Sequence, residues 1–149
     1  MKFIANTKTS LNLNLIIFMN LTKAIEKIAE ELGGSFTEYS QNNLILTVPI
    51  ADGRFQGVTT YLSERAGVQV IEFASRVCDA DIPNLNFRHV LEVNQELVYS
   101  KVVIFEGFLQ LAASVVVEHA TEDILKDIVK EIGHTADNLE RELTGADIH

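Results

Sequence analysis

The sequence has little of what stabilises a small secreted scaffold or a fibrous protein. It holds one cysteine, Cys78, in 149 residues, so an intramolecular disulfide is impossible. It has only two prolines against 47% hydrophobic residues, which excludes a disordered or Pro-rich chain. A free cysteine usually behaves as a small hydrophobe, so we expect Cys78 to pack near a strand end.

Positive charge is also scarce. Twelve Lys and Arg stand against 21 Asp and Glu, which gives a net charge of −9, and the basic residues form no cluster. Such a chain cannot neutralise phosphates, so the composition argues against a nucleic-acid partner. An acidic surface is also repelled by anionic membranes. The length and composition therefore predict a single soluble domain that binds neither nucleic acid nor a membrane, and we expect it in the cytoplasm.

The motifs that usually carry chemistry are missing. The four histidines, at positions 89, 119, 134 and 149, have no metal-ligand spacing, and no CxxC or GxSxG is present. The pair Gly33-Gly34 follows a predicted helix, whereas a phosphate-binding loop precedes one. The sequence therefore predicts no catalytic, cofactor-binding or metal-binding residues, no cofactor, and a protein that is not an enzyme.

The charged pairs have simpler interpretations. We expect Glu30-Glu31, Glu122-Asp123 and Glu140 with Glu142 to lie on solvated helix faces or to complement helix dipoles. Ser63-Glu64-Arg65 predicts a local ion pair at a strand end.

The stretch 97–118, LVYSKVVIFEGFLQLAASVVVE, predicts a β-hairpin on which the domain is assembled. Its arms are Tyr99–Phe105 and Phe108–Val117, joined at Glu106-Gly107. The first arm is apolar on both faces, which indicates a central strand or one that is covered on both sides. In the second arm, alternate residues share a face. One set is entirely apolar and is expected in the core: Leu109, Leu111, Ala113, Val115 and Val117.

The other face of the second arm is mixed, with Gln110 and Ser114 among its members. It could be solvated or could meet a partner. The sequence therefore offers a possible partner surface made of Phe108, Ala112 and Val116.

Helical and strand periodicities complete the order of elements. We expect a helix over 20–32, four strands over 35–40, 44–48, 55–64 and 68–77, a second helix over 87–97 after Pro83, the hairpin, and a long helix from the Thr121 cap to about Leu143. Gly133 could bend that last helix or end it early. Short connections predict an α+β domain, an antiparallel sheet with helices packed on one face, in the order α-β-β-β-β-α-β-β-α.

The sequence divides into an N-terminal extension (1–19), one domain (20–143) and a tail (144–149). The extension superficially resembles a signal peptide, but no A-x-A-like site follows it. Two other interpretations stay open. Met19 could be the true start, or the alternation of Leu11, Leu13 and Leu15 with Asn12 and Asn14 could form a strand that pairs with a sheet edge.

The line HVLEVNQELVYSKVVIFEGFLQLAASVVVEHATEDILKDIV resembles the YbjN-type family, whose fold is shared with the type III secretion chaperones. The matching marks are Asn94 in a helix, Lys101 in a strand, the Glu106-Gly107 turn and the Thr121-led final helix. The resemblance spans about residues 20–143. It implies a binding domain without catalytic residues, in which Asn94 ties the helix to the sheet and Lys101 lays its stem on apolar surface.

Two functions follow from these observations. The first is a non-enzymatic protein-binding domain, chaperone-like or regulatory, whose partner is another protein or a second copy in a homodimer. The alternative is a small-molecule binding or sensing domain with a pocket between the last helix and the sheet.

Overall fold

The structure is a computed structural model that describes residues 2–145, with side chains described from residue 12 onward. Three α-helices and a six-stranded sheet form two layers, and the elements follow the predicted order. Their bounds are α1 Lys2–Glu31, β1 Ser35–Ser40, β2 Asn43–Pro49, β3 Phe55–Arg65, β4 Val68–Asp79, α2 Phe87–Val93, β5 Lys101–Phe105, β6 Phe108–Val116, a 3₁₀ turn Val117–His119 and α3 Glu122–Thr144.

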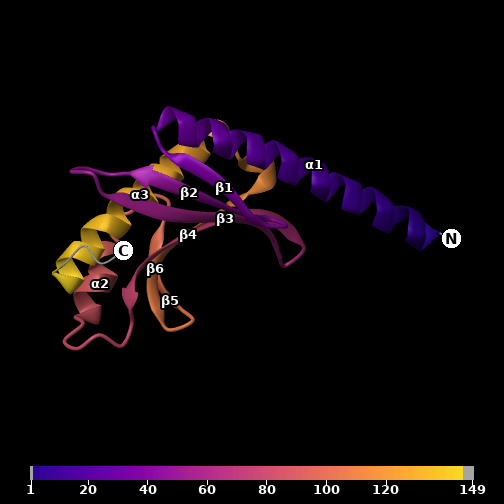
Figure 1. Ribbon diagram of the computed structural model, residues 1–149. Coiled ribbons are helices and arrows are strands. Elements are labelled where there is room, and N and C mark those ends of the chain that lie inside the picture. Colours follow the sequence, from indigo (N-terminus) through magenta and orange to yellow (C-terminus); the bar gives the residue numbers. More distant parts are fainter. Residues whose placement is uncertain (1, 146–149) are drawn as a thin grey trace.

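The sheet is antiparallel throughout, in the order β1-β2-β3-β4-β6-β5 (Figure 1). The first four strands form a meander, and the final hairpin adds to its far edge through β6. The helices pack on one face, as predicted. The opposite face, which we call the open face, is left without a helix cover.

The predicted hairpin is confirmed in detail. Phe105 pairs with Phe108 across a two-residue turn, in which Glu106 and Gly107 have φ angles of 49° and 83°. Two successive positive φ values define the turn type that best matches the twist of paired strands. Gly107 takes this conformation without cost, since it has no Cβ. The turn also accepts a hydrogen bond from the Ala80 N–H to the Gly107 carbonyl, at 2.8 Å.

The core lies between the helices and the inner face of the sheet. Leu109, Leu111 and Ala113 of β6 are buried there, while Val115 and Val117 are partly buried against the same cluster. Each fully buried large aliphatic side chain stabilises the fold by about 1.5–3 kcal/mol. The predicted apolar stripe of α3 faces this layer, and its buried members are Leu125, Ile128, Val129, Ile132, Ala136 and Leu139.

The last helix is capped as predicted. The Thr121 side chain accepts a hydrogen bond from the Ile124 N–H, and Gly145 ends the helix in the left-handed conformation. Gly133 does not end the helix, which continues to Thr144, and it is buried against Val48 of the sheet. The predicted tail lies mostly outside the described residues, which end at 145.

Three predictions about elements are wrong. The N-terminal stretch is not a strand, because α1 runs without a break from Lys2 to Glu31, so Leu13 and Leu15 lie on a helix. The first arm of the hairpin is not central, because β5 forms an edge of the sheet, where Ile104 and Phe105 are more than half exposed. The second helix ends at Val93, four residues before its predicted end.

Asn94 explains the early end of α2. It caps the helix, and its side-chain oxygen accepts a hydrogen bond from the Val102 N–H of β5 at 2.6 Å. The amide therefore ties the helix to the sheet, as the family resemblance implies.

Candidate partner-binding face

The three residues of the predicted partner surface lie on one strand, where the open face approaches the β5 edge. Strand pairing puts Phe108 opposite Asp79, Ala112 opposite Ala74, and Val116 opposite Val70. Alternation along β6 directs these side chains away from the core, because their neighbours Leu109, Leu111 and Ala113 are buried. All three are partly buried.

Only one of the three residues borders a hollow. A cavity of about 410 Å³ lies on the open face and is lined by Ala112 but by neither Phe108 nor Val116. Phe108 is covered by Arg76, whose guanidinium lies 3.5 Å from the ring centroid. Of the three residues, Ala112 therefore lines the hollow, and Phe108 and Val116 lie to either side of it on the same strand.

Residues of β5 line the hollow together with polar side chains of the neighbouring strands, among them Gln110 and Ser114. Val103 and Phe105 line it and are exposed, as is Tyr99 just before the strand. The sequence pattern did not assign them to the surface, because a strand that is apolar on both faces is more typical of a sheet interior. An exposed apolar edge strand is uncommon in a monomer, because it offers both main-chain hydrogen bonds and apolar contact to another chain.

A carboxylate closes one side of the hollow. Glu72 is buried on β4, where it accepts hydrogen bonds from Tyr61 at 2.6 Å and Ser63 at 2.9 Å and pairs with Arg65. Burial alone would raise the pKa of Glu72, but these donors together hold it below its usual value. Burial and the bond to Glu72 raise the pKa of Tyr61 to about 12. The predicted ion pair of Arg65 with Glu64 is wrong, since Arg65 reaches across to the neighbouring strand.

The segment that leads into β5 is held by a single carboxylate from α3. Glu131 accepts hydrogen bonds from the backbone N–H groups of Val98, Tyr99 and Ser100 at 2.7–3.0 Å, and from the Ser100 hydroxyl at 2.7 Å. Burial would raise the pKa of Glu131, but the bonds from these residues lower it overall. The Lys101 ammonium closes the same segment by donating to the carbonyls of Leu97 and Ser100. The edge strand therefore starts from a fixed position.

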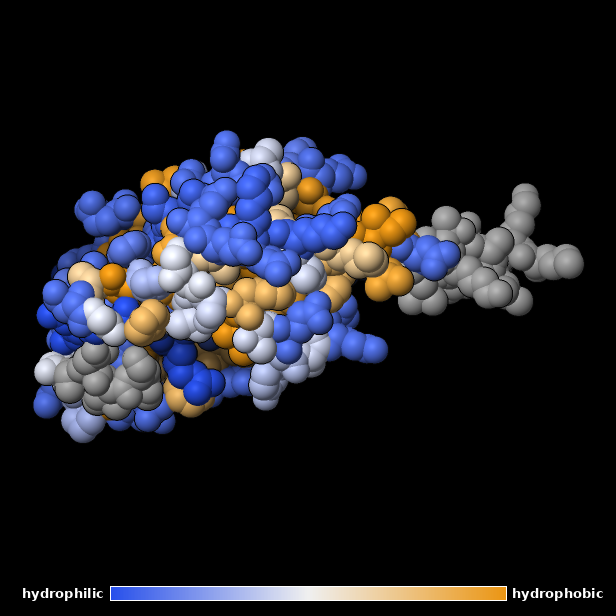
Figure 2. Space-filling view, turned by 45° about the horizontal axis from the view of Figure 1, so that its top comes forward, coloured by the Kyte–Doolittle hydropathy of each residue, from blue (hydrophilic) through white to orange (hydrophobic). Residues whose placement is uncertain are grey.

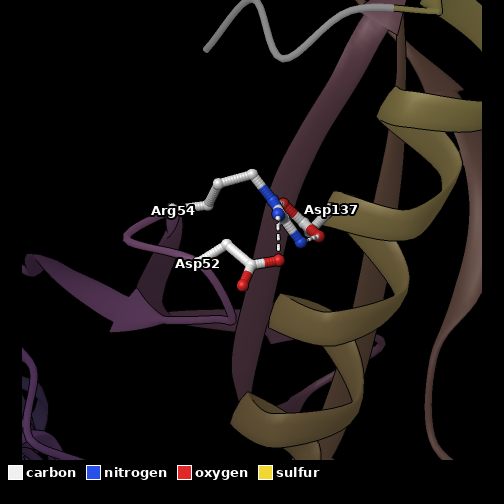
Figure 3. Close-up of polar contacts among 3 residues, drawn as sticks. All are labelled: Asp52, Arg54 and Asp137. Carbon is white, nitrogen blue, oxygen red and sulfur yellow. Dashed lines mark hydrogen bonds and ion pairs between the residues drawn. The ribbon is translucent and has the colours of Figure 1, made fainter.

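A second polar contact joins the other end of the sheet to α3. Arg54 donates two hydrogen bonds to Asp137, at 3.0 and 3.1 Å, and lies 3.5 Å from the exposed Asp52 (Figure 3). Asp137 is 2% exposed, so its charge is balanced by a partner, as burial requires. The expectation of a solvated Glu140 is also wrong, because that side chain is buried on the same helix. No sequence motif pointed to the Arg54–Asp137 pair or to the burial of Glu140.

The predicted small-molecule pocket has a counterpart near the start of α3. A cavity of about 310 Å³ lies between α1, β4 and the first turn of α3, lined by Leu21, Ile71 and Leu125 among others. Its lining is largely apolar, and Thr121 and Glu122 supply polar groups.

Within the described residues, no group of three or more His, Cys, Asp and Glu side chains comes close enough to hold a metal ion. His149 lies outside them. None of the described helices combines the length and apolar character needed to cross a bilayer. Cys78 is buried at the end of β4, as predicted, and burial raises the pKa of its thiol.

Comparison with known proteins places this architecture in a known class. The chain has the fold of a protein chain that was crystallised bound to another protein. That structure is the ExsC–ExsE complex: it matches with a TM-score of 0.59 and 16% sequence identity, over 84% of this chain and 94% of the other. No family model matches the chain, and no curated protein matches it by sequence. At this identity the likeness establishes the fold alone.

Proposed function

We propose that this protein is a non-enzymatic, chaperone-like protein-binding domain of the cytoplasm, related to the YbjN-type family, and that its partner docks on the open face at the β5 edge. The partner is a client protein or a second copy in a homodimer. The observation that carries the proposal is the exposed hollow in which Ala112, Val103 and Phe105 supply apolar surface that no part of the described chain covers. The fold shared with a chain of the ExsC–ExsE complex supports it.

The geometry suits an extended or flat apolar partner. β5 pairs only with β6, so its outer side offers main-chain groups, apart from the Val102 N–H that Asn94 holds, while the hollow beside it takes a side chain. Glu72 and Arg65 at the side of the hollow are already paired with each other. Lys101, Gln110 and Ser114 add polar groups beside the apolar ones, so a partner meets both kinds of side chain, as at a typical protein interface.

The test uses a charge placed in the hollow and the same charge placed at the opposite edge. Ala112→Glu puts a carboxylate on the open face at β6. Thr37→Glu is the matched control, because Thr37 lies on the same transverse row of the sheet, which runs from Lys101 through Ala112, Ala74, Thr59 and Ile45 to Thr37. Both variants should fold, because both positions face away from the core.

Affinity capture and light scattering are then measured for the three proteins. The proposal expects a captured partner, or a larger mass than that of Ala112→Glu, for the unmodified chain and for Thr37→Glu, and loss of that partner or added mass for Ala112→Glu. Equal behaviour of the two variants would place the partner elsewhere.

A second function is supported by the cavity beside α1. Its apolar wall and polar mouth are typical of a small-molecule site, and about 310 Å³ is at the lower end of the usual range. Native mass spectrometry of the purified protein would show a bound ligand, and Ile71→Trp, which fills the cavity, should remove it without affecting the open face.

A further inference from the structure

The N-terminal part of α1 has apolar side chains that no part of the described chain covers. We call residues 12–19 the arm. Asn14 fixes it against the body by accepting a hydrogen bond from the Gln69 side chain at 3.1 Å. Figure 2 shows hydrophobic side chains gathered where α1 leaves the body, and the exposed ones are Leu13, Leu15, Ile16 and Met19.

The arm itself holds no charged residue, but the N-terminal segment that contains it differs in charge from the rest of the chain. Residues 1–25 contain three lysines and no acidic residue, a charge of +3, while the remainder holds nine basic and 21 acidic residues, a charge of −12. Residues 1–25 are therefore attracted to the body of another copy. An anionic membrane would attract this segment but repel the body, so the charges favour a second copy as the occupant.

A groove at the other end of the molecule has the complementary character. It measures about 330 Å³ and lies between α2 and α3, with Val93, Leu97 and Leu139 as its apolar part. The carboxylates of Glu96, Glu131 and Glu142 also line it. Glu131 is engaged with the loop before β5, and Glu142 contacts the His89 imidazole. Glu96 and Glu142 are exposed, so both can meet a cation.

We propose that the arm of one copy docks in the α2–α3 groove of a second copy. Within one chain the two features lie at opposite ends of the body, and the arm is part of one continuous helix (Figure 1). A chain therefore cannot fill its own groove. Apolar residues of the arm cover the apolar part of the groove, and Lys23, one turn beyond the arm, lies beside its acidic residues. Reciprocal docking closes a dimer, and one-way docking forms longer chains.

The first experiment measures self-association by sedimentation at ionic strengths of about 0.01 M and about 1 M, where the Debye length is about 30 Å and about 3 Å. We expect salt to weaken the association. Glu96→Lys with Glu142→Lys should raise the dissociation constant about tenfold or more. Glu26→Lys with Glu30→Lys makes the same change of charge on the exposed side of α1, away from the groove, and should have a smaller effect.

The second experiment locates the contact by disulfide trapping between two variants. Ile16→Cys is mixed with Asn138→Cys, which lies in the groove, and separately with Tyr39→Cys, which is exposed on β1. Cys78 stays in place, because it is buried. Selective trapping of Ile16→Cys with Asn138→Cys supports the proposal, and it should persist in Ala112→Glu, which tests the separate partner face.

Three results would overturn the proposal. These are equal trapping at Asn138→Cys and Tyr39→Cys, absence of trapping, or association that ignores both salt and the groove variant. Binding of the arm to phosphatidylglycerol vesicles by a chain that stays monomeric would assign the arm to a membrane surface instead.

Discussion

Glu131 holds the segment before β5, and removing it should destabilise the protein measurably. The carboxylate accepts four hydrogen bonds, two of them from Ser100, which is fully buried. A buried donor left without an acceptor costs about 1–3 kcal/mol. The N–H groups of Val98 and Tyr99 belong to exposed residues and can turn to water. The loss for Glu131→Ala is therefore about 2–3 kcal/mol, dominated by Ser100.

Urea denaturation gives this free energy of unfolding directly. For a chain of this length, the same loss lowers the melting temperature by about 5–10 °C. Glu131→Gln keeps one acceptor oxygen but puts an NH₂ group against an N–H donor, so we expect about half the loss. Asp127→Asn is the control, one turn earlier on the same helix. Asp127 is exposed and makes only a 3.5 Å contact to the Tyr99 hydroxyl, so its effect should stay within about 0.5 kcal/mol.

The pH dependence gives a second measurement of the same contact. The pKa of Glu131 is lower in the folded chain than in the unfolded one. Its charge therefore contributes stability that is present above the unfolded pKa of about 4.3 and is lost as the pH falls through the folded pKa. The difference in stability between the wild type and Glu131→Ala should be full near pH 7 and should shrink below about pH 5. A difference that does not change with pH, or a control that equals the variant, would contradict this role.

Three further predictions concern stability and titration. Gly34→Ala should lower the free energy of unfolding by about 1–3 kcal/mol in urea denaturation, because the added Cβ would lie 2.1 Å from a carbonyl oxygen of β2. Gly133→Ala, whose Cβ would lie 3.4 Å from its nearest neighbour, should instead stabilise α3 by up to about 1 kcal/mol. The reverse order of the two effects would refute the described packing around these glycines. Asp137→Ala should lower the free energy of unfolding by about 3–5 kcal/mol, because it removes this carboxylate from the Arg54 guanidinium, whose side chain is only 13% exposed. Asp52→Ala, at a side chain that is 87% exposed, should lower it by less than about 0.5 kcal/mol. Similar losses for the two variants would contradict the described Arg54–Asp137 pair. In a phenolate absorbance titration, Tyr61 should ionise near pH 12, and Tyr61→Phe should remove that step; a step near pH 12 that survives the substitution would be inconsistent with the bond to Glu72.

The hairpin, the order of the elements along the chain and the α3 stripe could be predicted because alternation and helical spacing report directly on burial. Leu111 and Ile128 fall in the core for that reason. The pattern failed where the same residues suit two structures. Leu11, Leu13 and Leu15 alternate like a strand, yet they continue a helix that is anchored by Leu21 and Ile25.

The residues around the hollow on the open face could be predicted from the sequence only in part. The mixed face of β6 pointed to Ala112, but the contribution of Val103 and Phe105 depends on β5 being an edge, and strand order is set by contacts between distant segments. The Glu131 contact and the Arg54–Asp137 pair could not be predicted for the same reason, because their partners lie 31 or more residues apart in the sequence.

The most direct test of a partner on the open face compares the mass and the captured protein of the unmodified chain with those of Ala112→Glu. The account predicts a bound partner, or a larger mass, for the unmodified chain and for Thr37→Glu, and loss of that partner or added mass for Ala112→Glu. No partner and the same mass in all three cases, or a partner retained equally by all three, would contradict it.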